Sequence, residues 1–463
     1  MCHSLIRHVR MIRMDALLLL MLFFVASTST KSLVSSTAAT KGDASVTHTE
    51  RLTLTGNIST VAGSQGYDGY YKMFGIAATT AKLDYTESVA IDAAGDLLIS
   101  TSDHMILKVT ASTGLITVVA GTGESGFSGD GALATTAKFY HPSGIALDKY
   151  GNIFVVDKFN HRIRKITLST GIITTVAGAG VGNNITAVDN VSAISTTLSY
   201  PTDVDLDALG NIYITDTGNG RVRKVTASTG IITSIAGNRR RREGLIFPAL
   251  GVAATTSSFT SPMGVTVDLS GNVFFTDFDH HSIYKVAART GFLTLVAGKN
   301  GDNSGYNGDD ISAKRAMLKH PTFITIDVLG SIYFSDVGND RVRKITARTG
   351  IITTMAGQSA TLDSSCRYHE HNGDGSIATS ATLCYIRGLA VDATGSIYIC
   401  DSRLVRKVTR YEEFPSSGVT PISTISIEAS PIVERQSSSA THIAGACHMT
   451  VILLITLLIS HLH

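Results

Sequence analysis

The sequence predicts an all-β fold, a six-bladed β-propeller with four antiparallel strands in each blade. Six similar segments follow one another, and each ends in an Ala-Gly pair whose glycine falls at position 63, 121, 178, 237, 298 or 357. The 43 glycines and only 8 prolines suit short strands joined by tight turns. Because four antiparallel strands cannot bury both faces of their sheet alone, we expect the units to pack in a closed ring, which leaves few exposed edges.

Each segment contains the same four strands, called a to d. In the second segment these are residues 144–148, 152–157, 162–166 and 172–178. The a–b turn has Asp at its first and Gly at its fourth position in all six segments, as is typical of a type I turn. The pairs are Asp92/Gly95, Asp148/Gly151, Asp207/Gly210, Asp268/Gly271, Asp327/Gly330 and Asp392/Gly395. The Asp that ends strand b and the Lys of strand c recur in nearly every segment, so we interpret them as structural rather than catalytic groups.

The ends of the repeat region predict how the ring closes. Residues 55–63 have the pattern of strand d but precede the first strand a, whereas the last segment loses the pattern after its strand c at 404–408. We therefore expect the N-terminal strand 55–63 to complete the sixth blade. An open solenoid of the same units is the alternative.

The repeat resembles the NHL-repeat family. The resemblance rests on P-x-G-[IV]-x-[VL]-D, then G-N-[IV]-[YF]-[VI]-x-D, then the Asn-His-Arg-Ile-Arg-Lys-Ile run that starts at Asn160, and it covers roughly 52–410. The first segment departs from it by having Thr101 in place of the strand-b Asp, and the sixth by having Ile386 in place of Pro. The resemblance implies a six-bladed propeller, a fold that some relatives use for binding, RNA recognition included, and others for metal-dependent lactonase or lyase chemistry.

The two ends of the chain predict an extracellular, tethered protein. Residues 1–29 combine arginines, a short apolar run and small residues, as a signal peptide does, and 30–51 form a linker. After the propeller, 411–439 is a polar, Ser- and Pro-containing stalk, and 440–463 has the layout of a GPI-anchor signal with Ser437 as the candidate lipid-anchor site. A single-pass helix is the alternative, but it would have to include His448 and would lack a basic stop.

The net charge and the expected extracellular location limit the classes of partner that the protein can bind. The net charge of +2 argues against a nucleic-acid binder, which usually carries a strong basic excess. We expect a protein or glycan partner, bound by the face that carries the long connections between blades, since long loops on a rigid scaffold commonly carry binding sites. The sequence does not indicate an oligomeric state.

A metal-dependent hydrolase or lyase is the alternative function. Its site would lie on the propeller axis and use Glu87 and Asp203 at the start of strand a, with His141 and His320 just upstream of other strands a. A three-ligand metal site needs convergent histidines or carboxylates, and this set is thin, so the sequence favours a binding protein over an enzyme.

No cofactor is expected, apart from weak candidates for Ca²⁺. Oxygen-rich residues gather in one inter-blade connection: Asp302, Asn303, Asn307, Asp309 and Asp310. Such side chains suit Ca²⁺, but the spacing of an EF-hand is absent, and Gly-Asp pieces are also ordinary turns.

Several further sites follow from local motifs. Glycosylation sequons begin at Asn57, Asn184 and Asn190. Cys366 and Cys384 are a candidate disulfide across the last long connection, although the odd number of cysteines leaves the pairing open. Four consecutive arginines, Arg239, Arg240, Arg241 and Arg242, form a candidate processing site or a patch for anionic ligands, with a solvated loop as the alternative.

Overall fold

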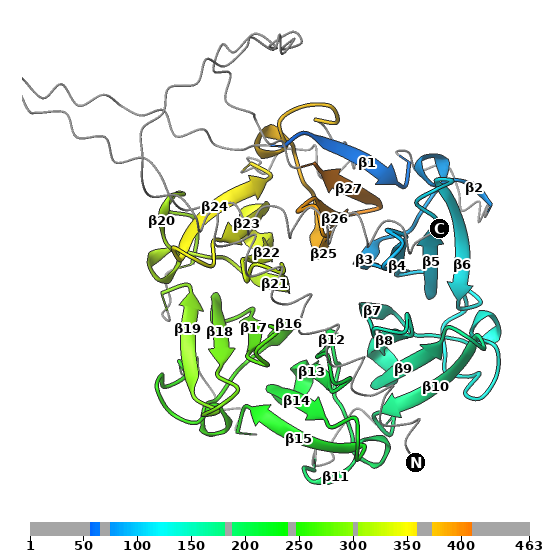
Figure 1. Cartoon of the computed structure of the whole chain (residues 1–463), viewed down its shortest axis with the longest axis horizontal. Helices are drawn as coiled ribbons and strands as arrows, with labels where there is room; N and C mark the ends of the chain where they lie inside the picture. The colour runs from blue at the N-terminus through cyan, green and yellow to red at the C-terminus, as the bar shows by residue number, and fades with distance from the viewer. Residues whose placement is uncertain are drawn as a thin grey trace, which may run out of the picture. The chain divides into compact units, whose positions relative to one another are not determined.

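The computed structural model describes residues 56–64, 75–180, 188–238, 247–299, 304–358 and 373–409. These residues form six antiparallel sheets arranged in a ring, with strand a of each sheet nearest the axis and strand d outermost (Figure 1). The predicted fold class is confirmed. Within the described residues, no helix is long and apolar enough to cross a membrane.

The strands follow one pattern in every blade, from the axis outward. Blade one is β3 (Thr86–Ile91), β4 (Leu97–Thr101), β5 (Met105–Val109) and β6 (Leu115–Ala120); blade two is β7 (Pro142–Leu147), β8 (Ile153–Asp157), β9 (Arg162–Thr167) and β10 (Ile172–Ala177). Blade three is β12 (Val204–Leu206), β13 (Ile212–Asp216), β14 (Arg221–Val225) and β15 (Ile231–Ala236); blade four is β16 (Pro262–Val267), β17 (Val273–Asp277), β18 (Ser282–Val286) and β19 (Leu293–Ala297). Blade five is β21 (Pro321–Ile326), β22 (Ile332–Asp336), β23 (Arg341–Ile345) and β24 (Ile351–Ala356); blade six is β25 (Ile386–Val391), β26 (Ile397–Asp401), β27 (Leu404–Val408) and β1 (Ile58–Ala62).

The ring closes as the sequence predicts. β1 pairs antiparallel with β27, with Ile58 opposite Val408 and Ser59 opposite Lys407, so the first strand of the chain completes the sheet of the last blade. Ile58 is fully buried in a core cluster that also contains Phe323 of blade five. Closure therefore depends on both main-chain pairing and apolar burial.

The outer edge of each blade is covered by the connection that arrives from the previous blade. Three of these connections form a short fifth strand against strand d: β2 (Ile76–Ala77), β11 (Val191–Ser192) and β20 (Ile311–Ser312). The other three make single bridges, as between Leu133 and Ile172. The prediction of four strands in every blade thus needs a correction for three blades. An exposed strand edge invites pairing with another chain, and part of each long connection prevents it.

After covering the edge, each connection turns inward through a single turn of 3₁₀ helix. These turns are η1 (Ala78–Thr80), η2 (Ala134–Thr136), η4 (Ala193–Ser195), η6 (Ala254–Thr256), η7 (Ala313–Arg315) and η9 (Ala378–Ser380), and each begins with a buried alanine. The carbonyl of Ala134 accepts a hydrogen bond from Gly121 N of the previous blade at 2.9 Å. Each turn is therefore a wedge between two blades.

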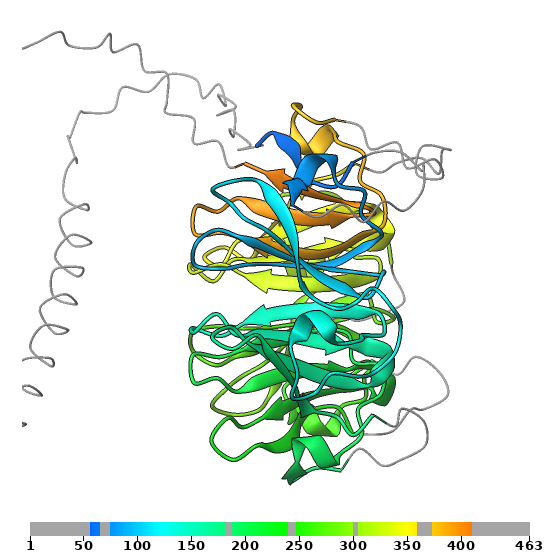
Figure 2. The ribbon, with the colours of Figure 1, turned by 90° about the vertical axis from the view of Figure 1, so that its right-hand side faces the viewer.

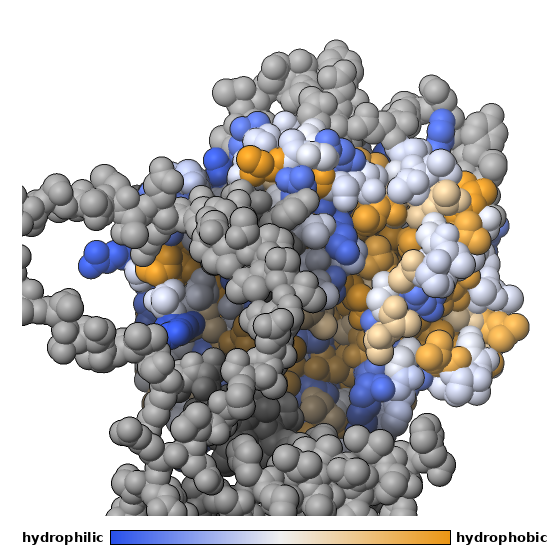
Figure 3. All heavy atoms as spheres, turned by 45° about the horizontal axis from the view of Figure 1, so that its top comes forward, coloured by the Kyte–Doolittle hydropathy of each residue, from blue (hydrophilic) through white to orange (hydrophobic). Residues whose placement is uncertain are grey.

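The hydrophobic cores lie between neighbouring blades rather than within one blade. One cluster joins Leu98 and Ile106 of blade one to Ile145 and Val155 of blade two, and the other interfaces repeat this arrangement. The edge-on view shows the blades side by side around the ring (Figure 2). On the outer surface that Figure 3 exposes, hydrophilic side chains are interspersed with hydrophobic ones. A blade cannot bury its apolar faces alone, so stability is shared around the ring.

In four of the six blades, a buried ion pair joins strand b to strand c. The carboxylate that ends strand b and an arginine in strand c, both fully buried, approach to between 3.2 and 3.5 Å; the pairs are Asp157–Arg164, Asp216–Arg223, Asp336–Arg343 and Asp401–Arg406. Each arginine also reaches an Asp of the inter-blade connection, namely Asp130, Asp189, Asp309 or Asp374. Sequence analysis singled out the strand-b Asp and the strand-c Lys but missed this Arg, although the R-[IV]-R-K pattern contains it.

The two remaining blades replace this pair in different ways. In blade one, Thr101 stands in the Asp position and Leu107 in the Arg position, so the charged partners are lost together. In blade four, Asp277 is kept but Tyr284 stands in the Arg position, and His280 Nδ1 lies 2.7 Å from Asp277 Oδ2 instead. In neither blade is a charge buried without a polar partner, an arrangement that would be costly.

Blade three allows the value of the pair to be measured. Arg223→Leu leaves Asp216 buried without its cation, so we expect the free energy of unfolding to fall by about 3–5 kcal/mol in urea titrations. The double variant Asp216→Thr/Arg223→Leu copies the combination of blade one and is expected to recover most of that loss. A double variant less stable than Arg223→Leu would contradict the interpretation.

The closing strand provides a second measurement. Ile58→Ala removes a fully buried side chain, and we expect a loss of about 2–5 kcal/mol together with faster amide hydrogen exchange in β1 and β27 than in the other blades. Ser59→Ala, at an exposed position of the same strand, is the control and should change neither quantity. Equal exchange in all six blades would show that β1 is not the closing element.

Candidate functional site

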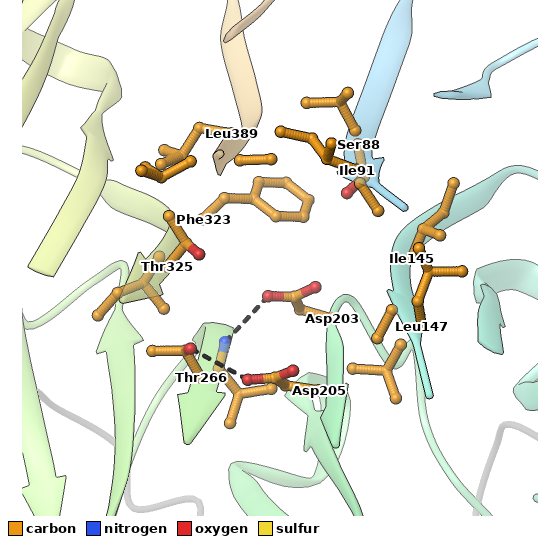
Figure 4. Close-up of a pocket in the computed structure, with 18 residues that line it drawn as sticks. Ser88, Ile91, Ile145, Leu147, Asp203, Asp205, Thr266, Phe323, Thr325 and Leu389 are labelled. Atoms are coloured by element: carbon orange, nitrogen blue, oxygen red, sulfur yellow. Dashed lines mark hydrogen bonds between the residues drawn. The ribbon is translucent and has the colours of Figure 1, made fainter. Parts of the chain in front are cut away.

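Two faces of the ring follow from the strand order. The b–c connections and the inter-blade connections emerge on one face, which we call the long-loop face, and the a–b and c–d turns lie on the opposite one, which we call the turn face. The six strands a surround a cavity of about 230 Å³ on the axis between them. Most of the residues that line it are of apolar type, including Ile145 and Phe323, while Asp203 and Asp205 bring two carboxylates into it (Figure 4).

The two axial carboxylates bind backbone groups of the next blade. Asp203 Oδ2 accepts a hydrogen bond from Val265 N at 3.0 Å, and Asp205 Oδ2 accepts from Val267 N at 2.9 Å and from the Thr266 hydroxyl at 3.0 Å. Desolvation raises the pKa of Asp203 well above its usual range and that of Asp205 to about 6. Strand a of blade four has no further strand on its axial side, so these carboxylates satisfy donors that would otherwise lack a partner.

A charged cluster, which we call the mouth cluster, lies at the start of strands a on the long-loop face. It consists of Glu87, His141, Lys158 and Arg387, contributed by blades one, two and six. The buried Glu87 Oε2 lies 3.1 Å from Arg387 Nη1, and its Oε1 lies 3.7 Å from His141 Nε2. Burial raises the pKa of Glu87, although Arg387 and Lys158 oppose this. Burial and the same two cations lower the pKa of His141 to about 4, so His141 is neutral at pH 7.

Aromatic side chains adjoin the mouth cluster and form what we call the aromatic rim: Tyr140, Phe159 and Tyr200. The Phe159 ring lies 5.0 Å from Tyr140 and 6.0 Å from Tyr200, both edge-on. Lys158 Nζ lies 5.7 Å from the Phe159 ring centre. Tyr140 and Tyr200 keep 44% and 39% of their surface exposed, so the rim presents aromatic surface to solvent beside Lys158.

Histidines link neighbouring blades on this face, and two of the three lie beside the rim. His104, His161 and His281 end their b–c connections in the left-handed backbone conformation. The Nδ1 atom of each accepts a hydrogen bond from a backbone N–H of the next blade: from His141 at 3.1 Å, from Tyr200 at 3.0 Å and from His320 at 3.2 Å. Because acceptance at Nδ1 leaves the proton of a neutral ring at Nε2, these contacts also set the tautomer. Sequence analysis missed these hydrogen bonds between blades. The only sign of them in the sequence is that His recurs at the end of the b–c connection.

The structure brings together two of the four residues of the predicted catalytic alternative. Glu87 and His141 are neighbours in the mouth cluster. Asp203 lies in the axial cavity, and His320 stacks on Phe278 at 4.2 Å on the side of blades four and five. In the part of the chain that the structure describes, no group of three His, Cys, Asp or Glu side chains is arranged to hold a metal ion.

The weak Ca²⁺ candidates are engaged in protein contacts where they are described. Asn307 donates to Arg315 O at 3.0 Å and accepts from Met317 N at 2.7 Å. Asp309 binds Arg343 and the Thr354 hydroxyl, and Asp310 N donates to Ile352 O. Asp302 and Asn303 lie outside the described residues. The described members thus have structural partners within blade five and its connection.

The remaining sequence motifs are only partly described. Asn57 lies beside the closing strand and bridges to Ile377, and Asn190 is exposed in a left-handed backbone conformation. Cys384 is disulfide-bonded and Cys400 is a buried free thiol. The other residues of these motifs lie outside the described residues: Asn184, Cys366, Ser437 and Arg239, Arg240, Arg241 and Arg242.

The raised pKa of Asp203 predicts a pH dependence. A carboxyl whose pKa rises on folding stabilises the fold below its unfolded pKa, near 4, and loses that contribution as pH rises through the folded pKa. We therefore expect Asp203→Asn to be at least as stable as the wild type at pH 7 and to lose less stability than the wild type between pH 4 and pH 8, measured by urea unfolding. Ser59→Ala, at an exposed position without a titratable side chain, should retain the wild-type slope. A steeper slope for Asp203→Asn would contradict the assignment.

Comparisons with known proteins agree with this architecture. The profile of the Teneurin NHL domain matches residues 116–188, and that of the NHL repeat matches residues 198–225. Teneurin-3 of Mus musculus is 30% identical over 291 residues, which are 56% of this chain and 10% of that protein. Protein SUPPRESSOR OF QUENCHING 1, chloroplastic, of Arabidopsis thaliana is 26% identical over 366 residues, which are 75% of this chain and 32% of that protein. The chain thus spans about a tenth of the teneurin and a third of the plant protein.

Solved structures share the fold. A Bacteroides thetaiotaomicron protein of unknown function superposes with a TM-score of 0.54 and 18% identity, covering 76% of this chain and 75% of its own. An auxiliary nutrient binding protein of the same organism gives a TM-score of 0.54 and 15% identity, covering 77% and 76%. The repeat motifs, the six-bladed ring and the matched profiles together show that the chain belongs to the NHL-repeat family of β-propellers.

Proposed function

We propose that this protein is an extracellular binding module that recognises a protein or glycan through the aromatic rim and mouth cluster of its long-loop face. The single observation that carries the proposal is the continuity of these two groups. Exposed Tyr140 and Tyr200 flank Phe159, and the Phe159 ring lies 5.0 Å from His141 of the mouth cluster.

The chemistry of this patch suits recognition. Tyrosines offer an apolar ring and a hydroxyl that donates or accepts hydrogen bonds, and they are enriched among the residues that dominate binding energy. A pyranose ring stacks on the same surfaces, and Arg387 and Lys158 supply cations for acidic groups of either ligand class. Because interblade hydrogen bonds hold the backbone beneath the rim, little conformational entropy would be lost on binding.

An oxidising, extracellular compartment is supported by the covalent state of the chain. Cys384 is disulfide-bonded, and disulfides persist mainly in secreted and cell-surface proteins. The signal-like segment 1–29 and the anchor-like segment 440–463 agree with this compartment. We propose a GPI anchor in preference to a transmembrane helix, and release by phosphatidylinositol-specific phospholipase distinguishes the two.

The binding proposal is tested by substitution within the rim. The purified protein is applied to glycan arrays and to immobilised, detergent-solubilised cell-surface proteins, and each bound ligand is retested with Tyr140→Ala/Tyr200→Ala. We expect its affinity to fall at least about tenfold, as for the loss of interface anchors.

Phe292→Ala is the matched control, because Phe292 is an aromatic residue of similar exposure, 47%, at the outer edge of blade four. It should bind like the wild type. Equal loss in both variants, or none in the double variant, would refute a site at the rim.

A further inference from the structure

The turn face carries a set of large apolar side chains at the tips of its turns. Tyr150, Leu168, Leu209, Leu269, Val328 and Leu329 are between 60% and 91% exposed. All except Leu168 occupy the two central positions of a–b turns, and Leu168 lies in the adjacent c–d turn of blade two. They extend over four consecutive blades, two to five. Single exposed apolar residues are ordinary, but such a set on one face marks an interaction surface.

Folding does not require these side chains. The turn Asp holds the a–b turn by accepting backbone N–H groups; Asp207 Oδ1, for example, accepts from Leu209 N at 3.0 Å and from Asn211 N at 2.9 Å. The same turn forms in blade one with Ala93 and Ala94 at the tip, and in blade six with Ala393 and Thr394. The large residues of blades two to five therefore need a reason other than turn geometry.

Exposed cations stand among the apolar tips. Lys149 precedes Tyr150 in the same turn, and Arg289 and Arg348 are exposed in the c–d turns of blades four and five. Apolar side chains that project singly from a ring of turns, with cations between them, suit the boundary of a lipid bilayer, where the tips enter the acyl boundary and the cations meet the phosphate groups of the lipids. A groove for a peptide would instead gather its apolar residues in one concave site.

The chain also leaves the propeller on this face. β27 is strand c of blade six, so it runs from the long-loop face to the turn face, and its last residue, Val408, is paired with Ile58 at the start of β1. The apolar run 449–459 follows residue 409 by 40 positions. A tether supplied by that run would therefore attach at the turn face.

We propose that the turn face of blades two to five rests on a lipid bilayer, with its apolar tips in the interfacial region and Lys149, Arg289 and Arg348 against the phosphate groups of the lipids. This orientation directs the long-loop face away from the membrane. It goes beyond the binding function, because it concerns the opposite face and predicts nothing about the ligand of the rim.

The absence of tryptophan from the whole chain provides a clean test. Leu209→Trp places a single reporter on the turn face, and Tyr140→Trp places one on the long-loop face of the full chain. Each variant is mixed with vesicles of phosphatidylcholine, with brominated phosphatidylcholine as the quencher. We expect the Leu209→Trp emission to shift to the blue and to lose most of its intensity to the brominated lipid, whereas Tyr140→Trp emission stays unquenched.

A third variant separates the turn face from the tether. Adding Leu269→Asp and Val328→Asp to Leu209→Trp removes two apolar tips without touching the C-terminal run, and we expect quenching of the reporter to fall to the level of Tyr140→Trp. Each of three results would overturn the proposal: an unquenched Leu209→Trp, equal quenching at both faces, or a blue shift that depends on protein concentration but not on brominated lipid, which would indicate a second copy on this face. Loss of rim binding in the earlier experiment changes none of these readouts.

Discussion

The buried carboxylate at the end of strand b is the contact on which the long-loop face depends. In blade two, Asp157 accepts hydrogen bonds from Tyr140 N and from the Asn160 side chain, and it pairs with Arg164. One side chain thus holds the start of strand a, the b–c connection and strand c. Arg164 extends the network to Asp130 in the inter-blade connection. In the four blades that contain the ion pair, this network fixes the loops of the face relative to the strands.

The long inter-blade connections have a structural role. Parts of them cover the outer edge of the next blade and form the alanine wedge, and these parts stabilise the ring. Among the described residues, those that we propose for recognition lie where strand a begins and the b–c connection ends. This places the aromatic rim and the mouth cluster beside the axis, on backbone that hydrogen bonds join to the neighbouring blade. On the turn face the connections are short turns. The a–b turns keep the same Asp and Gly in every blade, and they differ between blades only at their two exposed central positions.

Glu87 illustrates how position rather than residue type decides a role. It is the only strand-a carboxylate at the mouth among those predicted as catalytic, and its pKa is raised by burial against the opposing effect of Arg387 and Lys158. Asp203, one position further along its own strand a, lies instead among apolar side chains and bonds the backbone of the next blade. Two residues of the same chemistry thus serve a surface cluster and an internal strand edge.

The sequence by itself determined the blade number, the four main strands and the closing strand, because strand period, turn residues and the Ala-Gly spacing are all local signals. It also pointed to Glu87, Asp203 and the two histidines as neighbours of the axis. Only the tertiary structure decided that Glu87 meets His141 and Arg387 while His320 stacks on Phe278, and that the second Arg of the strand-c motif, rather than its Lys, pairs with the strand-b Asp. These contacts join residues of different strands and blades, and their distances depend on how the ring closes, which no local pattern specifies.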